Sequence, residues 1–295
     1  MANILIDFSN ISKEEIDNLA QGTKIFLSKN KDDSLLAFGE PKDLLTLTNY
    51  KKIEIIKSKS TSLDITLELL KDESKKIDGI VAFRNYEEVK QSIPSNEIKN
   101  GFFTANYANA YSGKKTFIAD LGFNPNPSLD DWKSYLSQLK PIVTSKFGVE
   151  DPTFKYLIAD KLSIKKEDEE IINFFKEDDS YDGELTTNKF LEADADILLG
   201  RPDLIQATIS GINQGITIYN NYIKKGIDSN IGYRIGGAMI RGVINSFNYS
   251  IDRKIVSGGI ALIGYKKPLV LVDKNTTPNG LAACINFCKK IIEQK

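Results

Sequence analysis

The segment NILIDFSNISKEEIDNLA, residues 3–20, decides the class of fold. Its apolar run Asn3–Phe8 is typical of a buried strand. Ser12 and Glu15 follow with the spacing of a capping box, in which two side chains satisfy the free backbone N–H groups at the start of a helix. A strand that leads directly into a capped helix indicates an α/β protein.

The same alternation of short apolar runs and helical spacing continues along most of the chain. Strands are expected at Lys24–Leu27, Leu35–Gly39, Ile53–Ile56, Asp78–Phe83, Gly101–Ala105, Thr116–Leu121, Phe154–Ala159, Asp196–Leu199, Ile260–Ile263 and Leu269–Val272. Helices are expected at Pro41–Leu47, Leu63–Lys71, Ser128–Lys146, Lys166–Lys176, Pro202–Lys224, Ile231–Phe247 and Pro278–Glu293. The chain has no internal repeat and no Pro/Ser-rich linker. Residues 1–295 are therefore expected to form one α/β domain, or two lobes that exchange chain more than once.

The charge balance argues against several classes of protein. The 295 residues carry 39 basic and 40 acidic side chains, for a net charge of −1. No long basic stretch can neutralise the phosphates of a nucleic acid, so DNA or RNA binding is not expected. No apolar run approaches the roughly 18–20 residues of a membrane-spanning helix, and residues 1–10 lack the features of a signal peptide. We therefore expect a cytoplasmic protein.

The sequence contains no His and only two Cys, which limits the available chemistry. Nucleophile systems that depend on His are excluded, as is a His general base. A tetrahedral zinc site would have to be built from carboxylates, and no P-loop motif is present. Cys284 and Cys288 lie four residues apart on an expected helix, where we expect packing rather than a disulfide. Catalysis would fall to Lys, Asn, Ser, Thr, carboxylates or backbone N–H groups.

Several segments resemble, in their order and spacing, the phosphate acyltransferases of bacterial phospholipid synthesis (PlsX type). The clearest are FIADLGFNPNPSLDDW (117–132), ADADILLG (193–200) and SGGIALIGYKKPLVLVDKNTT (257–277). The first is similar to the family's L-D-V-G-A-N segment, with Asp120, Gly122 and Asn124 at its Asp, Gly and Asn. The second resembles the strand before the family's D-G-F-T-G-N loop. The third resembles its last pair of strands and the H-G-S-S turn.

The resemblance implies both a fold and an activity. The fold would be a mixed, mostly parallel sheet with helices on both faces, akin to isocitrate dehydrogenase. The activity would move a fatty acyl group from acyl carrier protein to inorganic phosphate, giving an acyl phosphate for phospholipid synthesis, without a metal or organic cofactor. The family also implies a homodimer, with Asn221–Lys254 at the dimer contact and in a weak peripheral contact with the membrane or the acyl carrier protein.

The chain departs from the family where glycines are expected. Residues 6–10 stand in place of D-A-M-G-G-D, residues 84–87 in place of G-N-T-G, and Pro202-Asp203-Leu204 in place of T-G-N. The family's His falls on Asp273 or Lys274. Glycines in such loops let backbone N–H groups close on a phosphate, so their loss removes an anion cradle.

Three places could hold a phosphate or a thioester carbonyl, and each also has a purely structural interpretation. Thr276 and Thr277 precede an expected helix, where they would form an anion site or an ordinary N-cap. Gly258 and Gly259 permit close approach of a ligand, or of packed backbone. Asp120, Gly122 and Asn124 follow an expected strand, where open α/β sheets bind ligands, but they could equally form a plain turn.

One lysine is a candidate by resemblance alone. The family uses a Lys in the segment after the Phe154–Ala159 strand, and Lys165 or Lys166 lies nearest to it. Both could also be solvated partners of the acidic residues that follow.

The leading hypothesis is thus a phosphate acyltransferase with Lys165 and Asn124 as catalytic residues, acting on acyl carrier protein or on acyl-CoA as in phosphotransacetylases. The alternative is a homologue that has lost its chemistry and binds acyl carrier protein or a lipid-synthesis partner.

Overall fold

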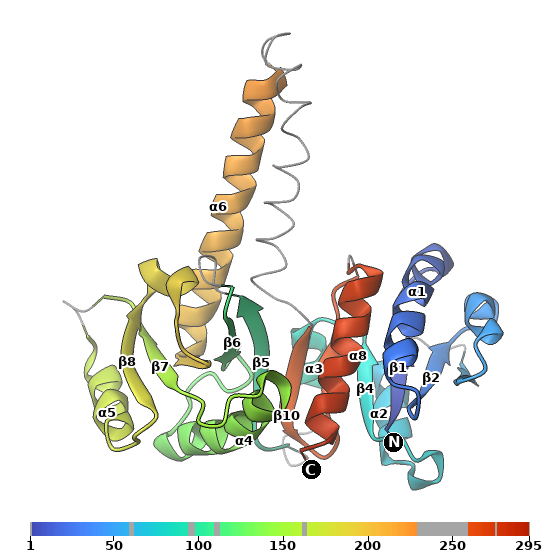
Figure 1. Cartoon of the computed structure of the whole chain (residues 1–295), viewed down its shortest axis with the longest axis horizontal. Coiled ribbons are helices and arrows are strands. Elements are labelled where there is room, and N and C mark those ends of the chain that lie inside the picture. The colour runs from blue at the N-terminus through green and yellow to red at the C-terminus, as the bar shows by residue number, and fades with distance from the viewer. Residues whose placement is uncertain are drawn as a thin grey trace. The chain divides into compact units, whose positions relative to one another are not determined.

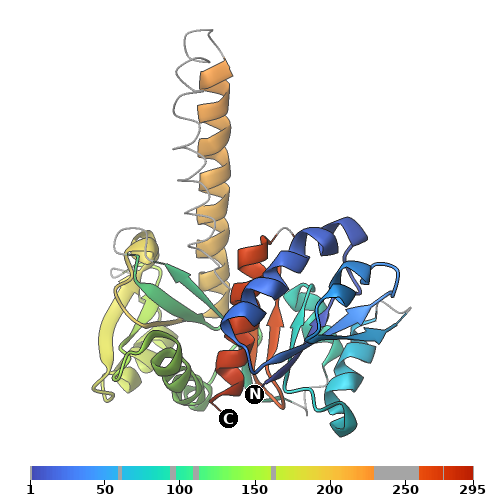
Figure 2. The ribbon, with the colours of Figure 1, turned by 45° about the vertical axis from the view of Figure 1, so that its right-hand side comes forward.

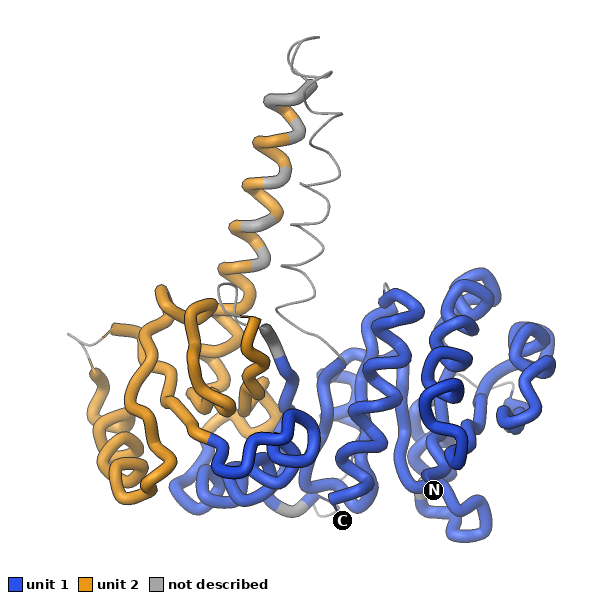
Figure 3. Tube along the Cα trace, viewed as in Figure 1, with its two compact units in different colours: residues 1–106, 127–152, 258–295 blue, residues 107–126, 153–257 orange. Residues whose placement is uncertain are grey.

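The computed structural model describes residues 2–58, 62–93, 98–108, 113–160, 164–228, 259–274 and 276–294. The chain divides into two compact units (Figure 3). Unit 1 consists of residues 1–106, 127–152 and 258–295, and unit 2 of residues 107–126 and 153–257. Each unit is therefore assembled from separate parts of the sequence.

The strands of unit 1 form a mostly parallel sheet (Figure 1). In spatial order they are β3 (Ile53–Lys57), β2 (Ser34–Gly39), β1 (Asn3–Asp7), β4 (Gly79–Ala82), β11 (Leu269–Leu271), β10 (Ile260–Tyr265) and β5 (Ile98–Ala108). Strand β10 pairs antiparallel with both of its neighbours, while β3, β2, β1, β4 and β11 are parallel. The central strands β4 and β11 are apolar and buried along their whole length, as is typical of parallel strands that are covered on both faces.

The helices of unit 1 pack in two groups. Helices α1 (Lys13–Lys29), α8 (Pro278–Ile292) and α4 (Leu129–Phe147) lie together, and α2 (Leu63–Lys71) contacts α3 (Tyr86–Ser92). Two 3-10 turns, η1 (Leu45–Asn49) and η2 (Glu73–Lys75), complete the unit. The capping box of Ser12 and Glu15 begins α1, as the sequence predicts. Helix α1 approaches α8 so closely that a Cβ on Gly22 would lie 2.5 Å from the Pro278 carbonyl oxygen.

Unit 2 has a parallel sheet of its own strands. Their order is β6 (Lys115–Ala119), β9 (Ile197–Gly200), β7 (Phe154–Ile158) and β8 (Tyr181–Thr186). Helix α5 (Lys166–Phe175) connects β7 to β8, and η4 (Thr187–Glu192) leads from β8 to β9. Helix α6 (Pro202–Asp228) follows β9, and Figure 2 shows it as a long helix. The rings of Phe154, Phe175 and Tyr181 fill the space between β7, β8 and α5.

The fold class expected from the sequence is confirmed, although several elements differ. The segment Lys24–Leu27 is wrong as a strand, because the helix that begins after Ser12 continues through it and buries Phe26. The helix expected at Pro41–Leu47 is instead a turn at 41–44 followed by the 3-10 turn η1, and the sequence did not predict β8 or α3. The expected helix Ile231–Phe247 lies outside the described residues, as does most of Asn221–Lys254.

Two other expectations concern single features. Cys284 and Cys288 are free and buried in α8, so the prediction that they pack rather than pair is confirmed. Within the described part of the chain, no helix is both long enough and apolar enough to cross a bilayer.

Candidate functional site

The carboxyl ends of parallel strands are the usual ligand sites in open α/β sheets. In unit 2, Ala119 of β6 lies opposite Leu199 of β9, so the segments that follow these two strands begin at the same edge of the sheet. The first is the turn 120–126, and the second is Arg201 with the start of α6. This edge holds Asp120, Gly122 and Asn124, three of the residues that the sequence analysis selects.

The turn after β6 is organised by a buried carboxylate. Asp120 accepts hydrogen bonds from the backbone N–H groups of Gly122 (3.0 Å), Phe123 (3.1 Å) and Asn124 (2.7 Å). Asp120 therefore fixes the shape of the turn, and it uses N–H groups that could otherwise cradle an anion.

A side chain of helix α6 also stabilises this turn. Gln206 donates from Nε2 to the carbonyl oxygen of Leu121 at 2.7 Å. Gly122 has φ +109°, and a Cβ on it would lie 2.1 Å from that same Nε2. The position thus requires glycine for its backbone and for the room that Gln206 occupies. No sequence pattern identifies Gln206, because a single amide side chain in a helix belongs to no motif.

The two residues predicted to be catalytic also have local roles. Asn124 Oδ1 accepts the N–H of Asn126 at 3.1 Å. Lys165 is the N-cap residue of α5, its side chain makes no capping hydrogen bond, and it is exposed. A catalytic role for either residue stays a prediction.

The predicted residues of unit 1 stabilise its own packing. Thr277 caps α8 and accepts the N–H of Gly280 at 3.1 Å. The N–H of Thr276 donates to the carbonyl oxygen of Asp273 at 3.0 Å. Gly259 has φ +81°, and a Cβ there would lie 2.4 Å from the Leu271 carbonyl oxygen. Gly258 lies outside the described residues. Phosphate binding by these residues stays a prediction, since each described one already serves the fold.

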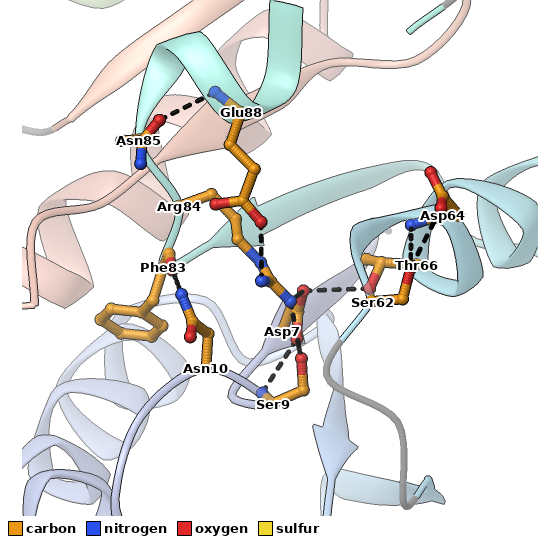
Figure 4. A network of polar contacts seen from close by, with 10 residues as sticks. All are labelled: Asp7, Ser9, Asn10, Ser62, Asp64, Thr66, Phe83, Arg84, Asn85 and Glu88. Atoms are coloured by element: carbon orange, nitrogen blue, oxygen red, sulfur yellow. Dashed lines mark hydrogen bonds and ion pairs between the residues drawn. The ribbon is translucent and has the colours of Figure 1, made fainter. Parts of the chain in front are cut away.

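A buried ion-pair network lies at the carboxyl ends of β1 and β4 in unit 1 (Figure 4). Arg84 donates to Glu88 at 2.9 Å and to the Ser9 hydroxyl at 3.0 Å, and its Nη2 lies 3.4 Å from Asp7 Oδ2. Asp7 also accepts from Thr66 Oγ1 at 2.9 Å. Polar side chains and ion pairs therefore occupy the ends of β1 and β4.

A second arginine, in unit 2, is held more loosely. Arg201 follows β9, its Nε lies 3.9 Å from Asp168 Oδ1, and its Nη2 lies 3.5 Å from Asp203 Oδ2. Asp168 is buried and accepts the hydroxyl of Tyr156 at 3.0 Å. Burial, followed by the neighbouring charge of Asp168, raises the pKa of Tyr156 far above its ordinary value, so its hydroxyl remains a donor.

The described residues contain no candidate metal site. No group of three or more His, Cys, Asp or Glu side chains gathers there in a way that could hold an ion.

Comparison with known proteins places the fold. No family model matches the chain, and no curated protein matches it in sequence. Solved structures of phosphotransacylases, however, share its α/β fold. One is a branched-chain phosphotransacylase from Enterococcus faecalis V583, with 13% identity, 99% of both chains covered and a TM-score of 0.62. Another is a phosphotransacetylase from Streptococcus pyogenes, with 15% identity, coverage of 99% of this chain and 94% of that one, and a TM-score of 0.51.

Proposed function

We propose that this chain transfers an acyl group from a thioester to inorganic phosphate, with acyl carrier protein as the donor. The observation that carries the proposal is the shared fold, which extends over 99% of this chain and 99% of a branched-chain phosphotransacylase. The order of the PlsX-like segments in the sequence supports the acyl carrier protein donor. A homodimer and a weak peripheral membrane contact belong to the same proposal.

The reaction needs no group that the chain lacks. A phosphate oxygen attacks the thioester carbonyl, the carbonyl oxygen takes up negative charge, and the carbon–sulfur bond then breaks to release a thiol. The product is an acyl phosphate. Such a reaction depends on positioning and on donors placed where the oxyanion develops, so it requires neither His nor metal. The amide of Asn124, at the carboxyl edge of β6, is suited to donate to that oxygen.

A second function is favoured by the network of Arg84 in unit 1. Arg84, Asp7 and Glu88 fill the ends of β1 and β4 with paired charges, and the turn N–H groups after β6 are taken by Asp120. Both features favour a homologue that binds acyl carrier protein or a lipid-synthesis partner without turnover.

One assay separates these functions. Purified chain is incubated with long-chain acyl carrier protein, or with the matching acyl-CoA, with and without inorganic phosphate. The acyl phosphate is trapped with hydroxylamine as a hydroxamate. Hydroxamate that requires both chain and phosphate supports the enzyme, and the preferred thioester identifies the donor. Binding of the acyl carrier protein without product would support the second function and refute the first.

Two variants of Asn124 give the assay an internal control. Asn124→Asp keeps an oxygen that accepts the N–H of Asn126, whereas Asn124→Ala removes both the oxygen and the amide donor. If the amide acts on the substrate, both variants lose activity, by about tenfold to a thousandfold for one oxyanion donor. If Asn124 serves only the turn, Asn124→Asp retains activity and the proposed role is wrong.

A further inference from the structure

We propose that Arg201 is the phosphate-binding residue of unit 2. The inference rests on the proposed function, because it names a residue that would hold the attacking phosphate. Arg201 was not singled out by the sequence, where it appears only as the residue between a strand and a predicted helix. Three observations support it: the position of Arg201 at the end of β9, the weak pairing of its guanidinium, and the different exposure of its two carboxylate partners.

The position is that of a ligand-binding residue. Arg201 comes directly after Gly200, the last residue of β9, and β9 lies between β6 and β7 in a parallel sheet. It precedes Pro202, the first residue of α6. The start of a long helix carries partial positive charge, which adds to that of the guanidinium.

The pairing of Arg201 leaves its donors underused. Its Nε is buried and has no hydrogen-bond partner among the described residues, and its two ion pairs are long, at 3.5 and 3.9 Å. The contrast with Arg84 lies at the terminal nitrogens and not at Nε, since Nη1 and Nη2 of Arg84 contact Glu88 and Ser9 at 2.9 and 3.0 Å. The side chain of Arg84 is 4% exposed and that of Arg201 is 22% exposed. A guanidinium fork that is reachable from solvent and loosely paired is suited to bidentate binding of phosphate.

The two carboxylates near Arg201 differ in what they can do when an anion arrives. Asp203 is 73% exposed, so it can turn into water and release Nη2 at little cost. Asp168 is buried and held by the hydroxyl of Tyr156, so it stays and keeps the guanidinium oriented. Phosphate would therefore replace Asp203 and not Asp168. Removing the charge of Asp203 should therefore strengthen phosphate binding. A misfolded variant would bind phosphate more weakly, so a gain in binding cannot result from misfolding.

The test measures inorganic phosphate binding to the full chain by isothermal titration calorimetry, beside the phosphate KM of the hydroxamate assay. Arg201→Ala is expected to weaken binding by about tenfold to a hundredfold, the loss typical of charged hydrogen bonds. Asp203→Asn is expected to strengthen it by about two- to fivefold, because an exposed ion pair competes only weakly. The matched control is Lys155→Ala, which removes a cation that is 18% exposed but paired with Asp182 at 2.7 Å. It should leave phosphate binding unchanged.

The outcomes separate this inference from the proposed function. If product forms but Arg201→Ala and Asp203→Asn both leave the phosphate KM unchanged, the inference is overturned and the proposed function stands. If phosphate binds and responds to both variants without any product, the site stands and the proposed function fails. If the wild-type chain binds no phosphate and forms no product, both are overturned.

Discussion

Replacing Gly259 with Ala would test whether this glycine serves packing rather than a ligand. The backbone of Gly259 has φ +81°, which costs about 1–2 kcal/mol for a residue with a Cβ. The new Cβ would also lie 2.4 Å from the Leu271 carbonyl oxygen and 3.1 Å from Cys284 Sγ. Overpacking of this kind costs about 1–3 kcal/mol more. Gly259→Ala should therefore lower the free energy of unfolding by about 2–5 kcal/mol.

Gly148 provides a matched control within the same unit. It ends α4 with φ +72°, and a Cβ on it would meet no atom within 4 Å. Gly148→Ala therefore carries the backbone cost of about 1–2 kcal/mol without the clash. The difference between the two variants measures the close approach of β10 and β11 to Gly259.

Urea titration followed by tryptophan fluorescence gives the measurement. Trp132 is the only tryptophan of the chain, and it is buried in α4 of unit 1, so the signal reports on that unit. The reasoning would be refuted if Gly259→Ala were no more destabilising than Gly148→Ala. In that case the room around Gly259 would be available, and its assignment to phosphate binding would regain support.

Three further predictions concern stability and reactivity. Thr277→Ala removes the N-cap of α8 and should destabilise unit 1 by about 1 kcal/mol in the same urea titration, whereas Thr277→Ser should not. Burial raises the pKa of the Cys284 thiol to about 12, so Cys284 and its buried neighbour Cys288 should react with Ellman's reagent at pH 8 only as fast as the native chain opens. Burial raises the pKa of Asp33, but the hydrogen bonds from Lys289 and from the Ala2 N–H, together with the positive charge of Lys289, outweigh it and hold the pKa below 3.8. Its stabilising effect should thus be present at neutral pH and vanish as the pH falls below 3.8, and Asp33→Asn should flatten that acid loss of stability; an unchanged acid profile would contradict this.

Local signals in the sequence predicted the regular elements well. The helix Leu63–Lys71 was predicted with the bounds that the structure has, because Ser62 caps it and its apolar residues share one face. The strand expected at Lys24–Leu27 was wrong for a tertiary reason. The apolar residues of Lys24–Leu27 are typical of a strand when read alone. The segment is helical because it belongs to α1, which packs against α8. Strand β8 was missed because its sequence, YDGELT, is half-exposed and polar, as suits the end strand of unit 2.

The candidate site was predictable only in part. Asp120, Gly122 and Asn124 were found because one short segment contains them and a strand precedes them. The partners that define their roles come from elsewhere in the chain, as Gln206 does, and no local pattern marks them. The same holds for Arg201 and Asp168, which lie far apart in sequence and meet only through the parallel arrangement of β7 and β9.

The position of β11 has a consequence for the order of synthesis. Strand β11 lies between β4 and β10, and the following helix, α8, packs against α1. A ribosome makes β1 to β4 early, then all of unit 2, and only afterwards residues 258–295. During that interval β4 has an open edge whose N–H and C=O groups can pair with other chains. Unit 1 therefore completes its sheet after unit 2 has been made, and a nascent chain halted before β11 would be the form most exposed to aggregation.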